Sequence, residues 1–97
     1  MTSDTPNIMT EEKLREITEA MISLLLKKNS DYGNASFDLG SNGNMVHLWD
    51  KVTRYRTQVE NLQKTGNKPN FESIDDTLRD IIGYAIIGLL ILEKDRT

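Results

Sequence analysis

The sequence has no cysteine and only one histidine, two prolines and a small share of aromatic residues. Without cysteine the chain forms neither a disulfide nor a thiolate metal site, which fits the cytoplasmic location that we expect. The single histidine, His47, excludes a histidine-rich metal site. The first residues lack the basic and apolar regions of a signal peptide. The longest uncharged run, 81–92, is too short to cross a bilayer, so we expect no membrane partner.

The charge of the chain is unevenly distributed. Fifteen acidic and twelve basic residues give a net charge of −3, and segment 72–80 alone holds four acids and one arginine. Duplex nucleic acid requires a basic face, so we expect no duplex nucleic-acid partner. A chain of 97 residues makes one domain with a small core. We predict a flexible N-terminal arm over 1–9 and a single helical domain over 10–97.

Apolar residues recur at helical spacing in three segments, which predicts an all-α fold of three helices. The first helix is expected over 11–28, after an N-cap at Thr10. The second is expected over 45–64 and the third over about 72–94. The Gly, Asn and Ser-rich segment before residue 45 is predicted to be a loop of about ten residues, which is close to the length that suggests a functional loop.

The third helix carries two rows of residues on opposite sides. One row is apolar throughout, and the other is acidic in its first half. From residue 81 onward the second row also becomes apolar, so this half of the helix is hydrophobic all round and is expected to be buried. The apolar row contains Ile74, Leu78, Ile81, Ala85, Leu89 and Leu92, and the acidic row contains Glu72, Asp76 and Asp80.

Two glycines, Gly83 and Gly88, lie inside this third helix. Each costs about 1 kcal/mol relative to alanine, so we expect another helix to approach closely there. Two neighbouring helices in a monomer are too few to cover the apolar surface. The sequence therefore predicts a homo-oligomeric helical bundle.

Carboxylates on the first and third helices are candidate ligands of a cation. Mg²⁺ takes oxygen ligands, and Asp76 and Asp80 stand one turn apart, within reach of one ion. Glu16 and Glu19 share the polar face of the first helix, and the alternative for them is a solvated acidic surface. The candidate metal ligands are Glu16, Glu19, Glu72, Asp76 and Asp80, with Mg²⁺ as the cofactor.

Basic and aromatic residues near the Gly-rich segment are candidate ligands of a nucleotide or another phosphate-bearing small molecule. Lys51 and Arg54 share a face of the second helix, and both side-chain types bind phosphate. Alternatively, Arg54 pairs with Asp50. For Lys28, Asp31 and Tyr32 the alternative role is termination of the first helix. For His47 the alternative is a structural role. The candidate set is Lys28, Asp31, Tyr32, His47, Lys51 and Arg54.

Three segments together resemble a known family. They are KKNSDYGN at 27–34, LWDKVTRYR at 48–56 and ESIDDTLRDIIGYAIIGL at 72–89. In this order they resemble the nucleotide modification associated domain, type 1, found in small phage and bacterial proteins. The resemblance implies a role linked to nucleotide metabolism and, for a phage-borne gene, residence in the host cytoplasm.

A second resemblance is to the MazG-type all-α nucleoside triphosphate pyrophosphohydrolases. Those enzymes hold magnesium with an E-x-x-E pair on one helix and an E-x-x-D pair on a later helix. Glu16 with Glu19, and Glu72 with Asp75, match these letters, but the second helix intervenes where that family has a shorter gap. This resemblance implies a magnesium-dependent reaction on a nucleotide.

Three functions are compatible with these patterns. The first is a magnesium-dependent pyrophosphohydrolase, so whether the protein is an enzyme stays open. The second is a metal-free protein that binds and sequesters a nucleotide, such as a signalling nucleotide of the host. The third is a structural or regulatory helical oligomer without a small ligand.

Overall fold

The computed structural model describes residues 7–65 and 71–97, and the side chains of Thr65, Phe71 and Glu72 lie outside the described part. The elements follow the order α1 (Glu11–Tyr32), η1 (Ala35–Phe37), α2 (Gly40–Thr65) and α3 (Phe71–Arg96), where η1 is a short 3₁₀ helix. The described residues form no strand. The prediction of an all-α fold with three helices is confirmed.

The first helix begins where the sequence predicts and ends later. The Thr10 hydroxyl oxygen accepts a hydrogen bond from the Lys13 backbone N–H at 3.2 Å, which is the expected N-cap. The helix then continues to Tyr32, one turn beyond the predicted end at residue 28. Gly33 ends it with a φ of 62°, a conformation that favours glycine, and donates its N–H to the Asn29 carbonyl at 2.7 Å. This extension keeps Lys28 on a regular helix.

The prediction of a loop of about ten residues between the first two helices is mostly wrong. The η1 turn occupies Ala35–Phe37, and α2 already begins at Gly40, which has a φ of 62°. The Gly and Asn residues that follow are therefore helical despite their low helix propensity. One tertiary contact favours this, because the Asn44 side chain donates a hydrogen bond to the Tyr84 carbonyl of α3 at 2.7 Å. Tertiary structure overrides local preference here.

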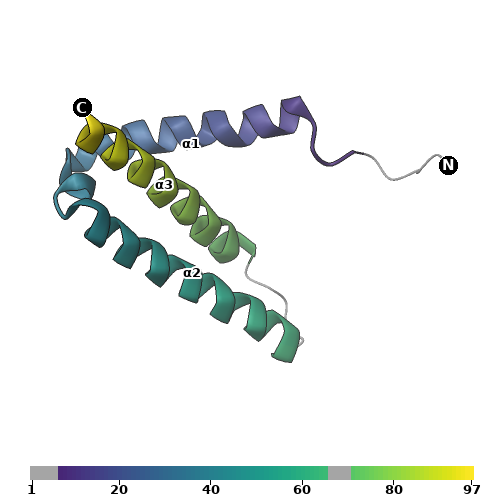
Figure 1. Ribbon diagram of the computed structural model, residues 1–97. Helices are drawn as coiled ribbons and strands as arrows, with labels where there is room; N and C mark the ends of the chain where they lie inside the picture. The colour runs from purple at the N-terminus through teal and green to yellow at the C-terminus, as the bar shows by residue number, and fades with distance from the viewer. Residues whose placement is uncertain (1–6, 66–70) are drawn as a thin grey trace.

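Helices α2 and α3 lie antiparallel and side by side (Figure 1). The C-terminal part of α1 contacts α3, and the N-terminal part of α1 extends away from the pair. The two glycines of α3 mark where the other helices come close. A Cβ on Gly88 would lie 2.6 Å from the Asn44 Oδ1 atom of α2, and one on Gly83 would lie 3.4 Å from the Leu25 Cδ2 atom of α1. The predicted close approach is found, and both partners belong to the same chain.

The single chain has an open shape. Its radius of gyration is 16.6 Å, compared with about 13 Å for a compact domain of about 100 residues. Among the described apolar side chains, only Met21 and Ile91 are fully buried. Much of the predicted apolar row of the third helix is exposed instead, since Leu89 is 65% exposed and Leu92 is 47% exposed. Homo-oligomer formation stays a prediction, and this exposed apolar surface supports it.

Membrane insertion by a helix finds no support in the described residues. None of their helices combines the length and the apolar character that a membrane span requires.

Candidate functional site

The polar face of α2 turns toward α3, and an ion pair lies at the centre of this contact. The Lys51 ammonium of α2 lies 3.2 Å from one carboxylate oxygen of Asp80. The Lys28 ammonium of α1 lies 3.6 Å from the other oxygen of the same carboxylate. The Asp80 side chain is 27% exposed and that of Lys51 is 20% exposed, so this pair is shielded more than a surface ion pair. All three helices therefore meet at Asp80.

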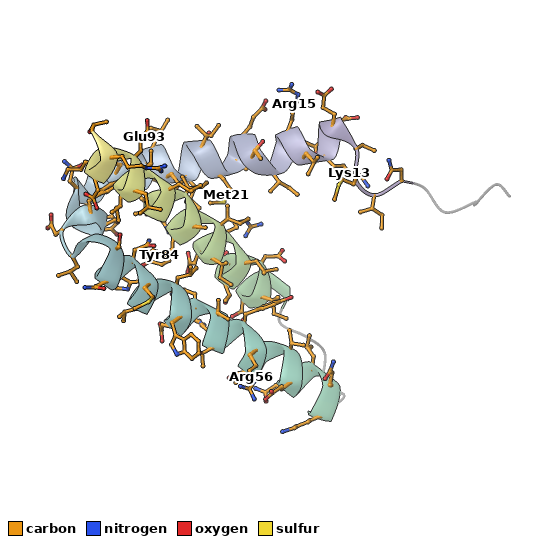
Figure 2. The ribbon with its side chains drawn as sticks, viewed as in Figure 1. Lys13, Arg15, Met21, Arg56, Tyr84 and Glu93 are labelled. Atoms are coloured by element: carbon orange, nitrogen blue, oxygen red, sulfur yellow. The ribbon has the colours of Figure 1, made fainter. Side chains whose placement is uncertain are left out.

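Further polar contacts follow the same side of α2 in both directions. The His47 ring stacks on the Tyr84 ring with 5.2 Å between centroids and 7° between planes. Figure 2 shows Tyr84 projecting from α3 toward α2. Two turns beyond Lys51, the Gln58 side-chain amide donates a hydrogen bond to the Ser73 hydroxyl at 2.8 Å. We call these residue pairs the polar interface.

The spacing of the polar interface fixes the register of the two helices. His47 and Lys51 are four residues apart along α2, and their partners Tyr84 and Asp80 are four residues apart along α3. From Lys51 to Gln58, and from Asp80 back to residue 73, is seven residues, or about two helical turns. Such equal steps keep every pair opposite its partner in an antiparallel arrangement. Because each pair needs this alignment, a slip of one turn would break all of them.

A cavity of about 230 Å³ opens beside Asp80, between α1, η1, α2 and α3. Its polar wall bears two ammonium groups, one guanidinium and one carboxylate, and its remaining wall is largely apolar. We call it the Asp80 pocket. Its lining consists of Met21, Leu24, Leu25, Lys28, Ser36, Lys51, Arg79, Asp80, Gly83, Tyr84 and Ile87.

A second cavity of about 300 Å³ adjoins the Asp80 pocket. The two share four lining residues, and the second is bounded mainly by apolar side chains from α1, η1 and α3. We call it the apolar hollow. Its lining consists of the shared Leu25, Lys28, Ser36 and Ile87, with Leu26, Asn29, Asn34, Phe37, Ile86 and Leu90.

The Asp80 pocket carries an excess of positive charge. One carboxylate faces the two ammonium groups of Lys28 and Lys51, which leaves one positive charge uncompensated. Arg79 also lines the pocket, but its guanidinium lies 3.1 Å from the Asp76 carboxylate and 4.0 Å from that of Asp75. The local field therefore favours an anion beside the lysines.

The structure separates the candidate ligand residues into two groups. Lys28 and Lys51 line the Asp80 pocket, and His47 contacts its Tyr84 wall. Asp31, Tyr32 and Arg54 are exposed and line neither of the two cavities, with Tyr32 at 72% exposure. A ligand role for these three stays a prediction.

The described acidic candidates of the first and third helices do not come together within one chain. Asp80 contacts two lysines, Asp76 contacts Arg79, and Glu16 and Glu19 are exposed on α1. Among the described residues, no three His, Cys, Asp or Glu side chains are grouped so that they could hold a metal ion. The Glu72 side chain lies outside the described residues. A metal site built from this set stays a prediction.

Several residues of the site were absent from the sequence-based set. Tyr84 stands one turn after Asp80, so extending the acidic row by one turn would have found it. Asn44 lay in the predicted loop and was therefore overlooked. Ser36 carries no signal in the sequence, because only the η1 turn places it at the pocket.

Comparison with known proteins gives one informative match. The family model of the nucleotide modification associated domain 1 matches residues 28–92, which include Lys28, Lys51 and Asp80. No protein with a curated description matches the chain, and no solved structure does. The family match covers about two thirds of the sequence and contains the whole polar interface. The chain therefore belongs to the nucleotide modification associated domain 1 family.

Proposed function

We propose that the protein binds a nucleotide in the Asp80 pocket and the adjoining apolar hollow, without requiring a metal ion. The phosphate lies between the Lys28 and Lys51 ammonium groups, and the base enters the apolar hollow beside Phe37. The observation that carries this proposal is the excess positive charge of the shielded Asp80 pocket next to an apolar cavity. A nucleotide has the matching form, with a charged end and a largely apolar aromatic end.

The size of the site supports a ligand of this class. Ligand-binding pockets usually enclose about 300–1,000 Å³. The Asp80 pocket of about 230 Å³ is slightly smaller, but it adjoins the apolar hollow of about 300 Å³. A nucleotide that spans both cavities has space for its phosphate and its base.

The two lysines have different tasks in this proposal. Lys51 is 20% exposed and 3.2 Å from Asp80, so its ammonium is held in place. Lys28 is 51% exposed and 3.6 Å from the same carboxylate, so its flexible side chain can turn toward an entering phosphate. Asp80 therefore positions Lys51, and Lys28 supplies the mobile charge.

The pyrophosphohydrolase hypothesis needs a different arrangement. Mg²⁺ held against a triphosphate requires several carboxylate oxygens around the ion. The described acidic side chains of one chain are dispersed, and Asp80 already contacts two ammonium groups. The geometry therefore supports binding better than magnesium-dependent hydrolysis.

Calorimetric titration of the protein with a panel of ribonucleotides and deoxyribonucleotides, in buffer without divalent cations, tests the proposal. We expect saturable binding of at least one nucleotide, and at least a tenfold loss of affinity for Lys51→Ala. Lys64→Ala is the matched control, because Lys64 is an exposed lysine on the same helix and lies outside both cavities. No binding across the panel at millimolar concentration, or an equal loss for both variants, would overturn the proposal.

A further inference from the structure

One face of α3 carries five apolar residues that are all exposed in the single chain. Leu78, Ile82, Ala85, Leu89 and Leu92 follow one another at alternating intervals of four and three residues. This 3.5-residue repeat is the pattern of a seam between two packed helices. Leu78 and Ile82 are each 37% exposed, Leu92 is 47% exposed and Leu89 is 65% exposed. We call these five residues the α3 stripe.

The α3 stripe points away from the other helices of the chain. Leu78 and Asp80 differ by about 200° around the helix axis, so the stripe lies on the side opposite the Asp80 pocket. The contact with α1 includes Gly83, and the contact with α2 includes Asp80, Tyr84 and Gly88, none of which belongs to the stripe. A partner on the stripe therefore leaves the nucleotide site accessible.

The exposed area of the chain matches the needs of a stable dimer. The chain exposes 8187 Å², whereas a compact monomer of 11.1 kDa exposes about 5,700 Å² by the usual size scaling. The excess is roughly 2,500 Å². An obligate homodimer interface buries about 1,000–2,500 Å² per subunit. Exposed apolar residues lie on α1 and α2 as well as on α3, so a second copy packed on the α3 stripe removes part of this excess.

The α3 helix is complementary to itself in an antiparallel orientation. Ala85 is the middle residue of the α3 stripe, and its small side chain lets two helices approach at a two-fold axis. Leu78 and Ile82 of one copy then pack along Leu89 and Leu92 of the other. A parallel orientation also matches the apolar residues, so the charges at the two ends decide between them.

The charged ends favour the antiparallel orientation. Asp75 precedes the stripe by three residues and is 57% exposed, with the Arg79 guanidinium 4.0 Å from its carboxylate. Arg96 follows the stripe by four residues and is also exposed. An antiparallel copy brings Asp75 of one chain near Arg96 of the other at both ends of the seam. A parallel copy brings like charges together at each end, which is unfavourable.

We infer that two copies of this chain form a homodimer in which the α3 stripes pack antiparallel, with the two Ala85 residues at the two-fold axis. The partner is a second copy because the same stripe supplies both halves of a complementary surface. This inference does not depend on nucleotide binding, since the stripe and the Asp80 pocket lie on opposite sides of α3.

Sedimentation analysis of the full chain at micromolar concentration gives the first test. We expect a species of twice the 11.1 kDa mass of one chain. Leu89→Glu should raise the dissociation constant at least a hundredfold. Val46→Glu is the matched control, because Val46 is an apolar residue of α2 with 62% exposure, and this variant should leave the dimer unchanged. A monomeric parent protein, or a stronger effect of Val46→Glu than of Leu89→Glu, would overturn the inference.

Disulfide cross-linking tests the orientation, and the absence of native cysteine makes it unambiguous. Leu78→Cys chains mixed with Leu92→Cys chains should form a mixed disulfide under mild oxidation. Leu78→Cys chains alone should stay uncross-linked, because residue 78 of one copy and residue 78 of the other lie at opposite ends of an antiparallel seam. Efficient cross-linking of Leu78→Cys with itself, or none in the mixture, would overturn the antiparallel arrangement.

Discussion

Lys51 of α2 reaches Asp80 of α3 with 3.2 Å between its Nζ atom and the Oδ2 atom of the carboxylate. The sequence places these residues in separate sets, a phosphate ligand on one helix and a metal ligand on another. The structure brings them into one pocket, where they neutralise each other in part. In the single chain Asp80 contacts two lysines, and its role as a metal ligand stays a prediction.

The first prediction concerns Asp80→Asn. Removal of this carboxylate leaves the Lys51 and Lys28 ammonium groups without their shared partner, so the free energy of unfolding should fall by about 1–2 kcal/mol, between surface and buried ion pairs. The affinity for a nucleotide should rise at the same time, because a charge that repels phosphate is gone. Urea unfolding and calorimetric titration measure the two effects.

Asp95→Asn is the control, because Asp95 is exposed near the end of α3 and far along the helix from the Asp80 pocket. Asp95→Asn should change neither the free energy of unfolding nor the affinity for a nucleotide. Loss of nucleotide binding in Asp80→Asn, with the fold intact, would mean that the positioning of Lys51 by this carboxylate outweighs its repulsion of the phosphate.

The second prediction separates the two glycines of α3. A Cβ on Gly83 meets Leu25 at an ordinary contact distance of 3.4 Å, so Gly83→Ala should gain about 0.5–1 kcal/mol from higher helix propensity. A Cβ on Gly88 would lie 2.6 Å from Asn44 Oδ1, so Gly88→Ala should disturb the Asn44 hydrogen bond to the Tyr84 carbonyl. We expect a net loss of about 1–2 kcal/mol, within the usual cost of overpacking.

Urea unfolding of both variants at one fixed protein concentration checks this contrast. Equal changes in the free energy of unfolding would contradict the close approach of α2 at Gly88.

The third prediction concerns Mg²⁺. Because the described acidic residues of one chain form no cluster, Mg²⁺ without nucleotide should leave the melting temperature of the protein unchanged. A magnesium-binding carboxylate site would instead raise it by mass action. Thermal unfolding with and without millimolar Mg²⁺ decides between them. A rise that Asp76→Asn and Asp80→Asn each abolish would favour the pyrophosphohydrolase hypothesis over metal-free binding.

The sequence predicts the number and type of the helices correctly because apolar periodicity and caps such as Thr10 are local signals. It also singles out Lys28, Lys51 and Asp80, which the structure brings to one pocket, although it assigns them to two separate sites whose ligands stay predictions. The pattern shows which residues share a face, but it cannot show which face another helix covers. Leu89 is expected to be buried, yet it is exposed, because the polar faces of α2 and α3 meet each other.

The start of α2 was missed for a different reason. Residues 40–44 have low helix propensity, and only contacts that are distant in sequence favour a helix there, such as the Asn44 hydrogen bond to Tyr84. The position of Ser36 at the Asp80 pocket depends on the same segment. Such contacts become visible only when the helices are placed in space.

The neighbouring lysines at the end of α1 provide the most direct measurement of the central claim, that the Asp80 pocket binds the phosphate of a nucleotide. Lys28 lines both cavities and contacts Asp80, whereas Lys27 is exposed and lines neither. The measurement is the shift in melting temperature that a nucleotide causes in Lys28→Ala and in Lys27→Ala. We predict that Lys28→Ala loses most of the shift and that Lys27→Ala keeps it; equal shifts in the two variants would contradict the claim.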